Sequence, residues 1–272
     1  MSSELNYRLI DSIHELEQVV ELQIKIWGSE ATTHLPQLLA SAHNGGIVNG
    51  AFNKENLIGF CYAFPGYKNN NLYLCSHMLG ILPSYRNGGI GSHLKLEQRK
   101  RALECGYRKI IWTFDPLQTR NAYLNLNRLG GYVREYYTSH YGEMKDKINI
   151  GLPTDRLLLE WDIDSSPLAD GESGDQKSSN WKRYHLCFKW SIKDDLPYPN
   201  LNKGLENGHE GYLLPVPTNI DSMKDSNLEL AYQWRIAIRN LLIPLLNSGY
   251  QITGLLKNEQ HVHYYVVEKL HK

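Results

Sequence analysis

The sequence predicts a mixed α/β fold of the α+β class. Strands and helices alternate along most of the chain, and a smaller element follows at the C-terminal end. Two observations carry this prediction. Strand-length apolar runs alternate with helical patterns over residues 6–163, and a polar, Gly/Ser-rich linker at 165–179 precedes a C-terminal β-α-β-β pattern. With 272 residues, 42% of them hydrophobic and 21% charged, the chain can form one substantial core plus a smaller unit.

The first predicted elements are a strand at residues 6–10 and an amphipathic helix at 13–27. The helix is indicated by apolar residues at helical spacing, namely Leu16, Val19, Val20 and the run from Leu22 to Ile26. Two further strands, at 46–52 and 56–64, flank the short polar stretch 53–55. We therefore expect an early hairpin, with the amphipathic helix packed against it.

A glycine-rich turn follows the next predicted strand. An apolar run at 72–82 predicts that strand, and Pro83 ends it because proline cannot continue a hydrogen-bond ladder. Leu94, Leu96, Ala102 and Leu103 then fall near helical spacing, and this pattern stops at Gly106. The strand therefore enters, and the helix leaves, the loop that carries the glycines.

This loop has the features of a phosphate cradle. Gly88, Gly89 and Gly91 let the backbone turn tightly, so that free N–H groups and the positive end of the helix dipole converge on an anion. Arg86 could add a charge-assisted contact. The order fits neither G-x-x-x-x-G-K-[ST] nor G-x-G-x-x-G, the two common phosphate motifs. A glycine-rich turn without a ligand is the alternative interpretation.

The observed order, R-x-x-G-x-G, resembles the pyrophosphate loop [RQ]-x-x-G-x-[GA] of the GNAT superfamily of acyl-coenzyme A N-acyltransferases, matched by Arg86, Gly89 and Gly91. A strand at 108–114, a helix at 121–132 and a final strand at 156–163 continue the order of that superfamily. The helix resembles its N-x-x-A-x-x-L-Y-x-K-x-G-F segment, with one extra residue before the aromatic Tyr132. Leu126 stands where many members carry a tyrosine that protonates the leaving thiolate, which leaves that role unassigned.

The resemblance implies a GNAT fold, with a mixed central sheet flanked by helices, over residues 1–164. It also implies acyl-coenzyme A, as acetyl- or succinyl-CoA, as co-substrate. The implied pantetheine and carbonyl partners are backbone groups of the strand around Leu79 and Ile81. The full set of implied cofactor-binding residues is Leu79, Gly80, Ile81, Arg86, Asn87, Gly88, Gly89, Ile90 and Gly91.

A closer resemblance covers nearly the whole chain. Its landmarks are residues 76–80, 113–131, 136–144 and 151–161, together with a later helix that carries Trp234 and Arg235. They are similar to a bacterial GNAT subfamily with an added C-terminal segment. Some members of that subfamily accompany N-succinylamino acid racemases and transfer succinyl groups to amino acids. The resemblance therefore implies an amino acid acceptor and a succinyl donor.

Candidate catalytic and acceptor residues come from the chemistry of acyl transfer to an amine. His77 is the first candidate for the general base, because a neutral imidazole can take the amine's proton directly or through water. Tyr141 is preferred over Tyr136 and Tyr137 as the thiolate acid, since the turn at Gly142 follows it. Structural roles in the strand or in core packing are the alternatives.

Acceptor binding needs charged groups. Arg156 could clamp an acceptor or acyl carboxylate bidentately, and Asp115 or Asp155 could position an ammonium group; ion pairing and helix capping are the alternatives. Cys75 has no accompanying His and carboxylate signature, so we expect a small buried thiol rather than an acyl-enzyme nucleophile.

Composition excludes several function classes. Lys plus Arg and Asp plus Glu each total 29, so the formal net charge of zero predicts no nucleic-acid or membrane partner. One local basic run could draw in a coenzyme phosphate or simply be a solvated face: Lys95, Arg99, Lys100, Arg101, Arg108 and Lys109. Four cysteines without C-x-x-C spacing suggest no metal and no disulfide framework. No signal sequence or long apolar run is present, so we expect a cytoplasmic protein.

The C-terminal element, at 180–272, is predicted as a strand at 212–216, a helix at 228–246 interrupted by Pro244, and strands at 250–256 and 262–268. It echoes residues 121–141 and could be a degenerate half-repeat, packed on the catalytic domain or forming a homodimer contact. An appended α+β element that completes the core is favoured over a second ligand site.

The sequence thus predicts an acyl-CoA-dependent N-acyltransferase that acts on a small amine, with amino acids favoured as acceptors. One alternative is acetyl transfer to a protein or polyamine. The other is an acyl-CoA sensor without catalytic groups, which the leucine at position 126 keeps open.

Overall fold

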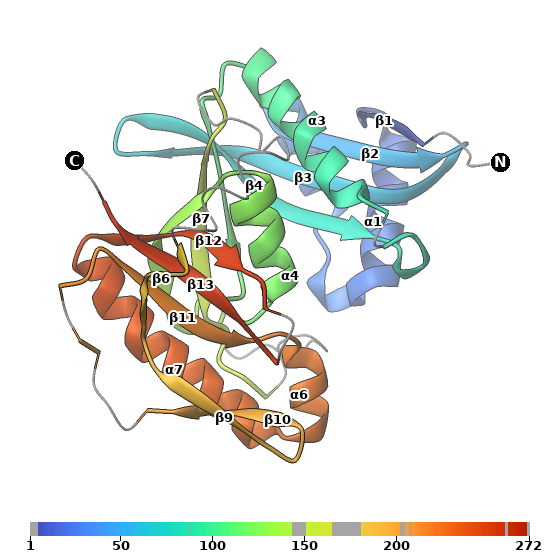
Figure 1. Ribbon diagram of the computed structural model, residues 1–272. Coiled ribbons are helices and arrows are strands. Elements are labelled where there is room, and N and C mark those ends of the chain that lie inside the picture. The colour runs from blue at the N-terminus through green and yellow to red at the C-terminus, as the bar shows by residue number, and fades with distance from the viewer. Residues whose placement is uncertain are drawn as a thin grey trace. The chain divides into compact units, whose positions relative to one another are not determined.

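The computed structural model describes residues 5–86, 88–142, 151–164, 181–201, 205–206, 208–258 and 261–270 (Figure 1). The chain forms two compact units, residues 1–112 with 161–165 and residues 113–160 with 166–272. It passes between them within strands β5 (Lys109–Phe114) and β7 (Arg156–Asp162). The predicted linker at 165–179 lies outside the described residues.

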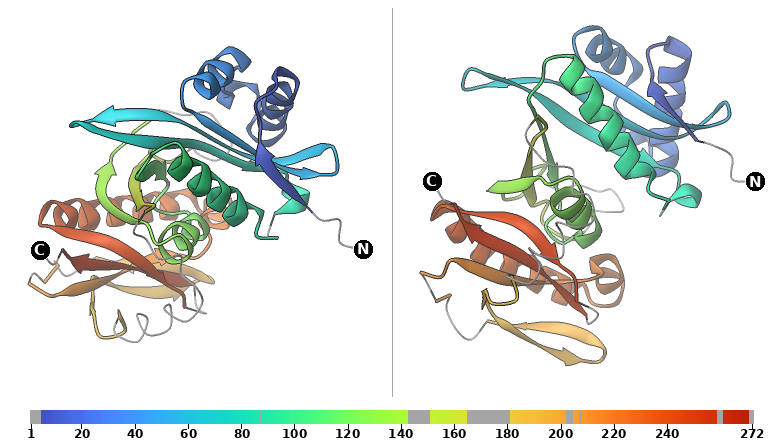
Figure 2. Two further views of the ribbon diagram at one scale, coloured as in Figure 1. Left: turned by 90° about the horizontal axis from the view of Figure 1, so that it is seen from above. Right: turned by 45° about the horizontal axis from the view of Figure 1, so that its top comes forward.

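The first unit is a mixed sheet with helices on both faces, as Figure 2 shows. Its strands lie in the order β1-β2-β3-β4-β5, with antiparallel neighbours except for the parallel pair β4 and β5. Besides β5, the strands are β1 (Asn6–Leu9), β2 (Ile47–Asn53), β3 (Asn56–Lys68) and β4 (Asn71–Ile81). The helices are α1 (Ile13–Trp27), η1 (Ser29–Ala31), α2 (Leu35–His43), η2 (Pro83–Tyr85) and α3 (Ile90–Glu104).

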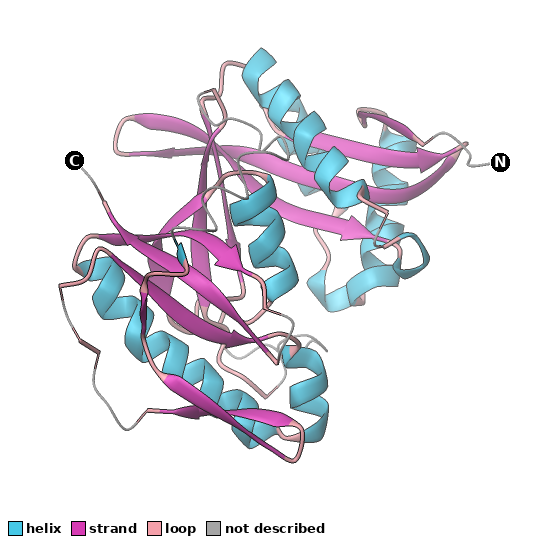
Figure 3. Cartoon of the chain, in the orientation of Figure 1, coloured by secondary structure: helices cyan, strands magenta, loops and turns pink. Residues whose placement is uncertain are grey.

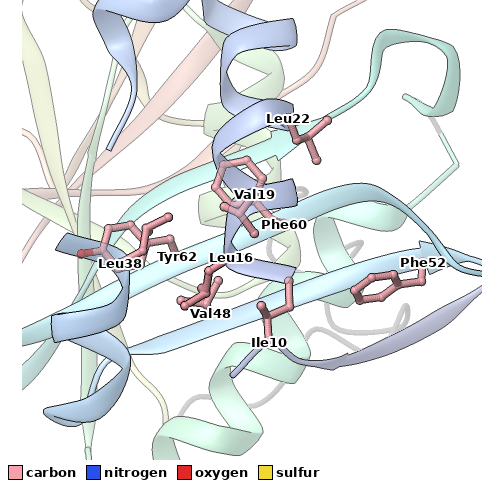
Figure 4. Packing of buried hydrophobic residues seen from close by; sticks show 9 residues of the cluster. All are labelled: Ile10, Leu16, Val19, Leu22, Leu38, Val48, Phe52, Phe60 and Tyr62. Atoms are coloured by element: carbon pink, nitrogen blue, oxygen red, sulfur yellow. The ribbon is translucent and has the colours of Figure 1, made fainter. Parts of the chain in front are cut away.

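The face under α1 and α2 holds the larger apolar cluster of this unit (Figure 4). Helix α1 begins at a reciprocal cap: Ser12 Oγ accepts from the Glu15 N–H at 3.3 Å and donates to the Glu15 carboxylate at 3.0 Å. Its apolar stripe then meets alternate residues of β2 and β3, and the cluster comprises Ile10, Leu16, Val19, Leu22, Leu38, Val48, Phe52, Phe60 and Tyr62. Apolar strand residues, which recur at every second position, and apolar helix residues, which recur about every 3.6 positions, therefore pack in one core.

Helix α3 covers the opposite face of the sheet. Its Ile90 and Leu94 pack with Ala51, Ile58 and Cys61. Ala51 and Cys61 alternate with the residues buried under α1, whereas Ile58 lies at a bulge in the pairing of β2 with β3. The sheet leaves no room for a side chain at Gly80, since a Cβ there would lie 2.7 Å from a ring carbon of Phe60. Packing against β3 and α1 therefore requires this glycine.

The second unit pairs a sheet with the long helix α7 (Leu228–Asn247) (Figure 3). Its strands lie in the order β7-β6-β12-β13-β11-β8. Besides β7, they are β6 (Tyr132–Tyr137), β8 (His185–Leu186), β11 (Gly211–Pro217), β12 (Tyr250–Leu256) and β13 (Val262–Lys269). The remaining elements are α4 (Thr119–Ala122), the π-helical turn η3 (Tyr123–Arg128), α6 (Ile220–Ser226) and the hairpin of β9 (Lys189–Lys193) and β10 (Leu196–Asn200).

The predicted strands and long helices are observed, but other elements were not predicted: helices α2 and α6, strand β8 and the β9-β10 hairpin. The helix predicted at 121–132 is α4 followed by the π-helical turn η3, which ends at Arg128. The interruption at Pro244 is wrong, because α7 continues to Asn247. Pro244 lies in the last turn, so its missing N–H removes only one hydrogen bond, close to the end of the helix. Ser248 caps that end by donating to the Pro244 carbonyl. No helix in the described part of the chain is both long and apolar enough to cross a membrane.

Candidate functional site

The C-terminal half of β4 has one backbone edge turned away from its partner β3. The Leu82 N–H donates to the Ile58 carbonyl of β3 at 2.9 Å. Because backbone groups alternate along a strand, those of Leu79 and Ile81 therefore face away from β3. On that side, the described pairs with β5 are Leu74 with Ile110 and Cys75 with Ile111, both before this point. The edge predicted to hold the cofactor arm is thus formed.

A β-bulge lies just before this edge. Tyr62 of β3 is opposite Met78 and Ala63 is opposite Ser76, so His77 is the extra residue of β4. A bulge re-aims the strand that follows it, and here it precedes Leu79 and Ile81. Strand propensities carry no signal for a bulge, so the sequence did not predict it.

His77 lies edge-on to two aromatic rings. The Tyr62 and Phe64 ring centroids are 6.0 and 5.8 Å from the imidazole centroid. The side chain keeps a solvent-exposed portion, while burial of the remainder lowers the pKa of His77 from its ordinary value. A lowered pKa keeps the imidazole neutral at physiological pH, which is the form that a general base needs.

The loop after β4 delivers a glycine to the start of α3. Gly89 is the N-cap residue with φ of 77°, in the left-handed region that glycine adopts without strain, and it makes no side-chain cap. Among the described residues, no hydrogen bond is recorded for the N–H groups of Ile90, Gly91 and Ser92. A 15-residue helix therefore presents free donors and its positive dipole end at this loop.

Arg86 folds back onto β4. Its Nε donates to the Ile81 carbonyl at 3.2 Å, and its side chain is exposed. Gly88 and Gly91 leave open or ordinary van der Waals space at their Cβ positions. Asn87, also predicted in this loop, lies outside the described residues. The other predicted cofactor residues thus occupy one continuous strand, loop and helix start.

Lys95 does not belong to a solvated basic face, which corrects the expectation from the sequence. Only 3% of it is exposed; its Nζ donates to Ser76 Oγ at 2.7 Å and lies 3.7 Å from the Trp112 ring centroid. Burial lowers the pKa of Lys95. Cys75 is near this cluster, and burial raises the pKa of its thiol, which agrees with an unreactive thiol.

In the second unit, the predicted acceptor residues Asp115 and Arg156 meet a third residue, Arg235. Asp115 Oδ2 accepts from Arg235 Nη2 at 2.6 Å, and Arg156 Nη1 lies 3.8 Å from the same oxygen. Arg235 is 1% exposed, and no described residue accepts from its Nε or Nη1. Beside Asp115 and Arg235 is a hollow with about the space of one water molecule, 10 Å³.

Asp155, which is fully buried, forms a second ion pair, with Arg239. Both its oxygens accept from Arg239, at 2.7 and 2.8 Å, while Tyr136 donates at 2.5 Å and the Ser139 N–H at 3.0 Å. Burial acts to raise the pKa of Asp155, but these hydrogen bonds outweigh it and the net shift is downward. Protein donors therefore occupy both oxygens of Asp155. Asp115 is occupied as well, since its Oδ2 accepts from Arg235 and its Oδ1 accepts from the Leu117 N–H at 2.7 Å, so an ammonium group at either carboxylate would have to displace one of these donors.

Sequence reasoning missed Arg239 and assigned no role to Arg235. They are four residues apart on α7, so helical periodicity would have placed them on one face. Together with Arg156, they set three guanidinium groups against the carboxylates of Asp115 and Asp155. The local charge therefore favours one further anion.

Of the tyrosines considered for the thiolate acid, Tyr141 is the most exposed. It is 46% exposed, its hydroxyl is 3.1 Å from Thr113 Oγ1, and Arg156 Cζ lies 5.2 Å from its ring centroid. Tyr136 is a poor acid, because burial and the Asp155 carboxylate strongly raise its pKa. Leu126, in the position of the usual tyrosine, is buried in the π-helical turn.

Comparison with known proteins agrees with the first unit's geometry. Residues 13–126 match the model of the acetyltransferase (GNAT) family. This stretch is GNAT-like. It holds the β4 edge, the glycine loop and α3, and the fold class is confirmed: a GNAT fold with a mixed sheet flanked by helices. The match covers somewhat less than half of the chain.

Several solved structures are similar to this chain. An acetyltransferase of the GNAT family from Streptococcus pneumoniae shares 14% identity over 58% of this chain and 98% of its own, with a TM-score of 0.47. An aminoglycoside 6'-acetyltransferase type Ii shares 19% over 60% and 99%, with a TM-score of 0.48. A GNAT family acetyltransferase from Elizabethkingia anophelis with acetyl-CoA bound shares 16% over 60% and 99%, with a TM-score of 0.43. No curated protein matches the chain.

Proposed function

We propose that the chain is an acyl-CoA-dependent N-acyltransferase whose first unit binds the coenzyme. The observation that carries this proposal is the start of α3: Gly89 caps a 15-residue helix without a side chain and leaves its first N–H groups free for an anion. The outward-facing backbone of Leu79 and Ile81 precedes this loop by a few residues. Both features lie within the segment that matches the acetyltransferase family.

In this proposal the coenzyme pyrophosphate binds Gly88, Gly89, Ile90 and Gly91, and Arg86 leaves the Ile81 carbonyl to join it. Backbone groups of Leu79 and Ile81 hold the pantetheine arm and the thioester carbonyl. The acceptor amine attacks that carbonyl carbon, and the developing oxyanion is stabilised by a backbone donor. No covalent enzyme intermediate is needed.

Two proton transfers complete the reaction. His77 takes the proton that the amine loses, directly or through water. When the tetrahedral intermediate breaks its carbon–sulfur bond, the thiolate leaves and receives a proton from an acid, for which Tyr141 is the candidate. The products are the N-acylated amine and coenzyme A.

The acceptor we propose is a small amine with a carboxylate, such as an amino acid, and the donor is acetyl- or succinyl-CoA. Arg156 and Asp115 are the proposed partners of the carboxylate and the ammonium group. The support is the charge of the second unit's cluster, where three arginines face two aspartates. We further propose a cytoplasmic enzyme, domain limits at 1–164 and 180–272, and a homodimer contact through the latter.

We expect Gly89→Asp to weaken coenzyme A binding by about tenfold or more, because a carboxylate at the helix start repels the pyrophosphate and closes the anion site. Gly106→Asp is the matched control, since Gly106 has φ of 84° at the other end of α3 and faces open space. Both variants strain a left-handed backbone and add one carboxylate, so the control separates the effect of a charge placed at the anion site from these shared effects. Isothermal titration with acetyl-CoA and succinyl-CoA measures the affinity.

Equal loss of affinity in Gly89→Asp and Gly106→Asp, or no loss in either, contradicts the loop assignment. The wild-type protein is then assayed for coenzyme A thiol release, with a blank for its four cysteines. Succinyl- and acetyl-CoA are each combined with D-amino acids, L-amino acids, polyamines or peptides. Release that depends on one pool identifies the acceptor class, whereas binding without release in every pool favours the acyl-CoA sensor.

Arg156→Gln tests the proposed acceptor class. A charge-assisted hydrogen bond contributes about 1.5–3 kcal/mol, so we expect KM for the active amino acid to rise about 10- to 100-fold with kcat little changed. KM for the corresponding amine without a carboxylate should stay the same. Arg134→Gln, at an arginine that contacts Gln251 on the surface of this unit, is the control. A parallel rise in KM for both acceptors would show that Arg156 does not read the carboxylate.

A further inference from the structure

Two histidines and a glutamate converge in the second unit, away from every residue assigned above. They are His185, Glu206 and His209, and their potential ligand atoms all lie within 4.8 Å of one another. Both His185 Nε2 and His209 Nε2 are 3.9 Å from Glu206 Oε2. The two imidazole rings are stacked, with centroids 4.2 Å apart and planes 5° from parallel. The two ring nitrogens therefore point toward the same carboxylate.

We propose that these three residues form a binding site for a divalent transition-metal cation of the zinc type. Two histidines and one carboxylate are a donor set that zinc uses with a water molecule as fourth ligand. Neutral imidazole nitrogens disfavour Mg²⁺ and Ca²⁺, which prefer oxygen ligands. The proposal goes beyond acyl transfer and replaces the expectation of no metal, which rested on cysteine spacing alone.

Metal geometry requires a turn of the imidazole rings as well as shorter distances. A metal lies in the plane of a ligating imidazole, and the two ring planes are only 5° from parallel, so at least one ring must rotate out of the stack. The side chains of His185 and His209 are 32% and 40% exposed, which leaves room for that rotation. In a tetrahedral zinc site with bonds of about 2.0–2.2 Å, neighbouring ligand atoms are separated by about 3.3 Å. The observed nitrogen-to-oxygen separations of 3.9 Å must therefore shorten by roughly half an ångström each. The Glu206 side chain is 67% exposed and can rotate to make this change.

The backbone that carries two of the ligands is held by buried tyrosine hydroxyls. Tyr212 is fully buried; its hydroxyl donates to the Glu206 carbonyl at 2.9 Å and accepts from the His209 N–H at 3.4 Å. The Tyr250 hydroxyl donates to the His209 carbonyl at 2.6 Å. These contacts hold the backbone at Glu206 and His209, which limits the conformational entropy lost when their side chains bind a cation.

The third ligand comes from a different part of the chain. His185 lies on β8, which pairs in parallel with β11 at Tyr212. A bound cation would therefore join the short edge strand β8 to Glu206 and His209, which precede β11 in the chain. Binding a ligand only in the folded state stabilises that state, so we infer that the cation strengthens this edge of the second unit.

Zn²⁺ titration of the tag-free, EDTA-treated full chain tests the proposal. We expect one Zn²⁺ per chain by calorimetry, a higher melting temperature with Zn²⁺, and Co²⁺ absorption bands typical of four-coordinate cobalt. His209→Ala and Glu206→Gln should each lose or greatly weaken this site, whereas excess Mg²⁺ should not compete. Glu206 is exposed, so its substitution leaves folding intact.

His261→Ala is the matched control, because His261 Nε2 lies 3.6 Å from a single exposed carboxylate, Asp195, in the same unit. It should bind Zn²⁺ as the wild type does. Equal Zn²⁺ binding by wild type, His209→Ala and Glu206→Gln would overturn the proposal, as would wild-type protein that binds no Zn²⁺. These readouts do not depend on acyltransferase activity, so the proposal stands or falls independently of the proposed function.

Discussion

His77→Ala should lower kcat by about 10²- to 10⁴-fold at saturating acyl-CoA, the usual contribution of a positioned general base. The imidazole belongs to the bulge residue of β4, two positions before Leu79. Burial also lowers the pKa of His77, which favours the neutral imidazole. Acyl-CoA affinity should change little, because the proposed phosphate contacts come from the loop after the strand. Stopped assays of coenzyme A release, with binding measured separately, give both numbers.

The pH profile separates a base from a structural histidine. Burial lowers the pKa of His77, so wild-type kcat should rise with pH through an apparent pKa below about 6.5 and then level off. That acidic limb should disappear in His77→Ala. His14→Ala, which removes an 82% exposed imidazole from α1, should leave both kcat and the profile unchanged. Unchanged turnover in His77→Ala would refute the assignment.

Much of the first unit follows from the sequence because its signals are local. Apolar residues at a period of 3.6 predict α1, and alternating residues around a polar turn predict β2 and β3. Gly89 was predicted because clustered glycines let the backbone turn tightly before a helix, and its φ of 77° is one that glycine adopts without strain. The sequence did not predict the bulge at His77 or the burial of Lys95, since both depend on contacts with residues distant in the chain.

For the charged groups of the second unit too, the sequence predicts single residues but not the contacts between residues distant in the chain. Asp115 and Arg156 could be proposed from the chemistry of an amino acid acceptor, but their partner Arg235 is separated from Asp115 by 120 positions. His185 and Glu206 are likewise 21 positions apart, with no metal-binding spacing between them. A sequence motif records neighbours along the chain, whereas these clusters are assembled by the sheet and by α7. Only the three-dimensional structure brings them together.

Asp155→Asn should lower the free energy of unfolding by about 3–5 kcal/mol, the cost of breaking a buried ion pair by removing one partner. Asp155 is fully buried and accepts from Arg239, Tyr136 and the Ser139 N–H. An asparagine keeps the size but presents an amide N–H₂ group to these donors and leaves Arg239 without its counter-charge. Urea unfolding at neutral pH measures the difference.

The dependence on pH follows from the lowered pKa of Asp155. A carboxyl whose pKa is lower in the folded state stabilises the fold fully above its ordinary value of 3.8, and this stabilisation is lost as the pH falls through the folded-state pKa. The gap between wild type and Asp155→Asn should therefore be constant down to about pH 4 and narrow below it. Asp195→Asn, at a 93% exposed carboxylate, should show no such gap.

These two readouts also decide which role Asp155 has. A large, pH-dependent loss of stability together with unchanged acyl-CoA affinity shows that the carboxylate is committed to Arg239 and Tyr136. Of the two carboxylates, Asp115, which pairs with Arg235, then stays the proposed partner of the ammonium group. If Asp155→Asn unfolds at the same urea concentration as Asp195→Asn, the buried pair contributes little to the fold. A raised KM for the acceptor in that variant would then return Asp155 to the acceptor site, where the charge of an amino acid's ammonium group could replace that of Arg239.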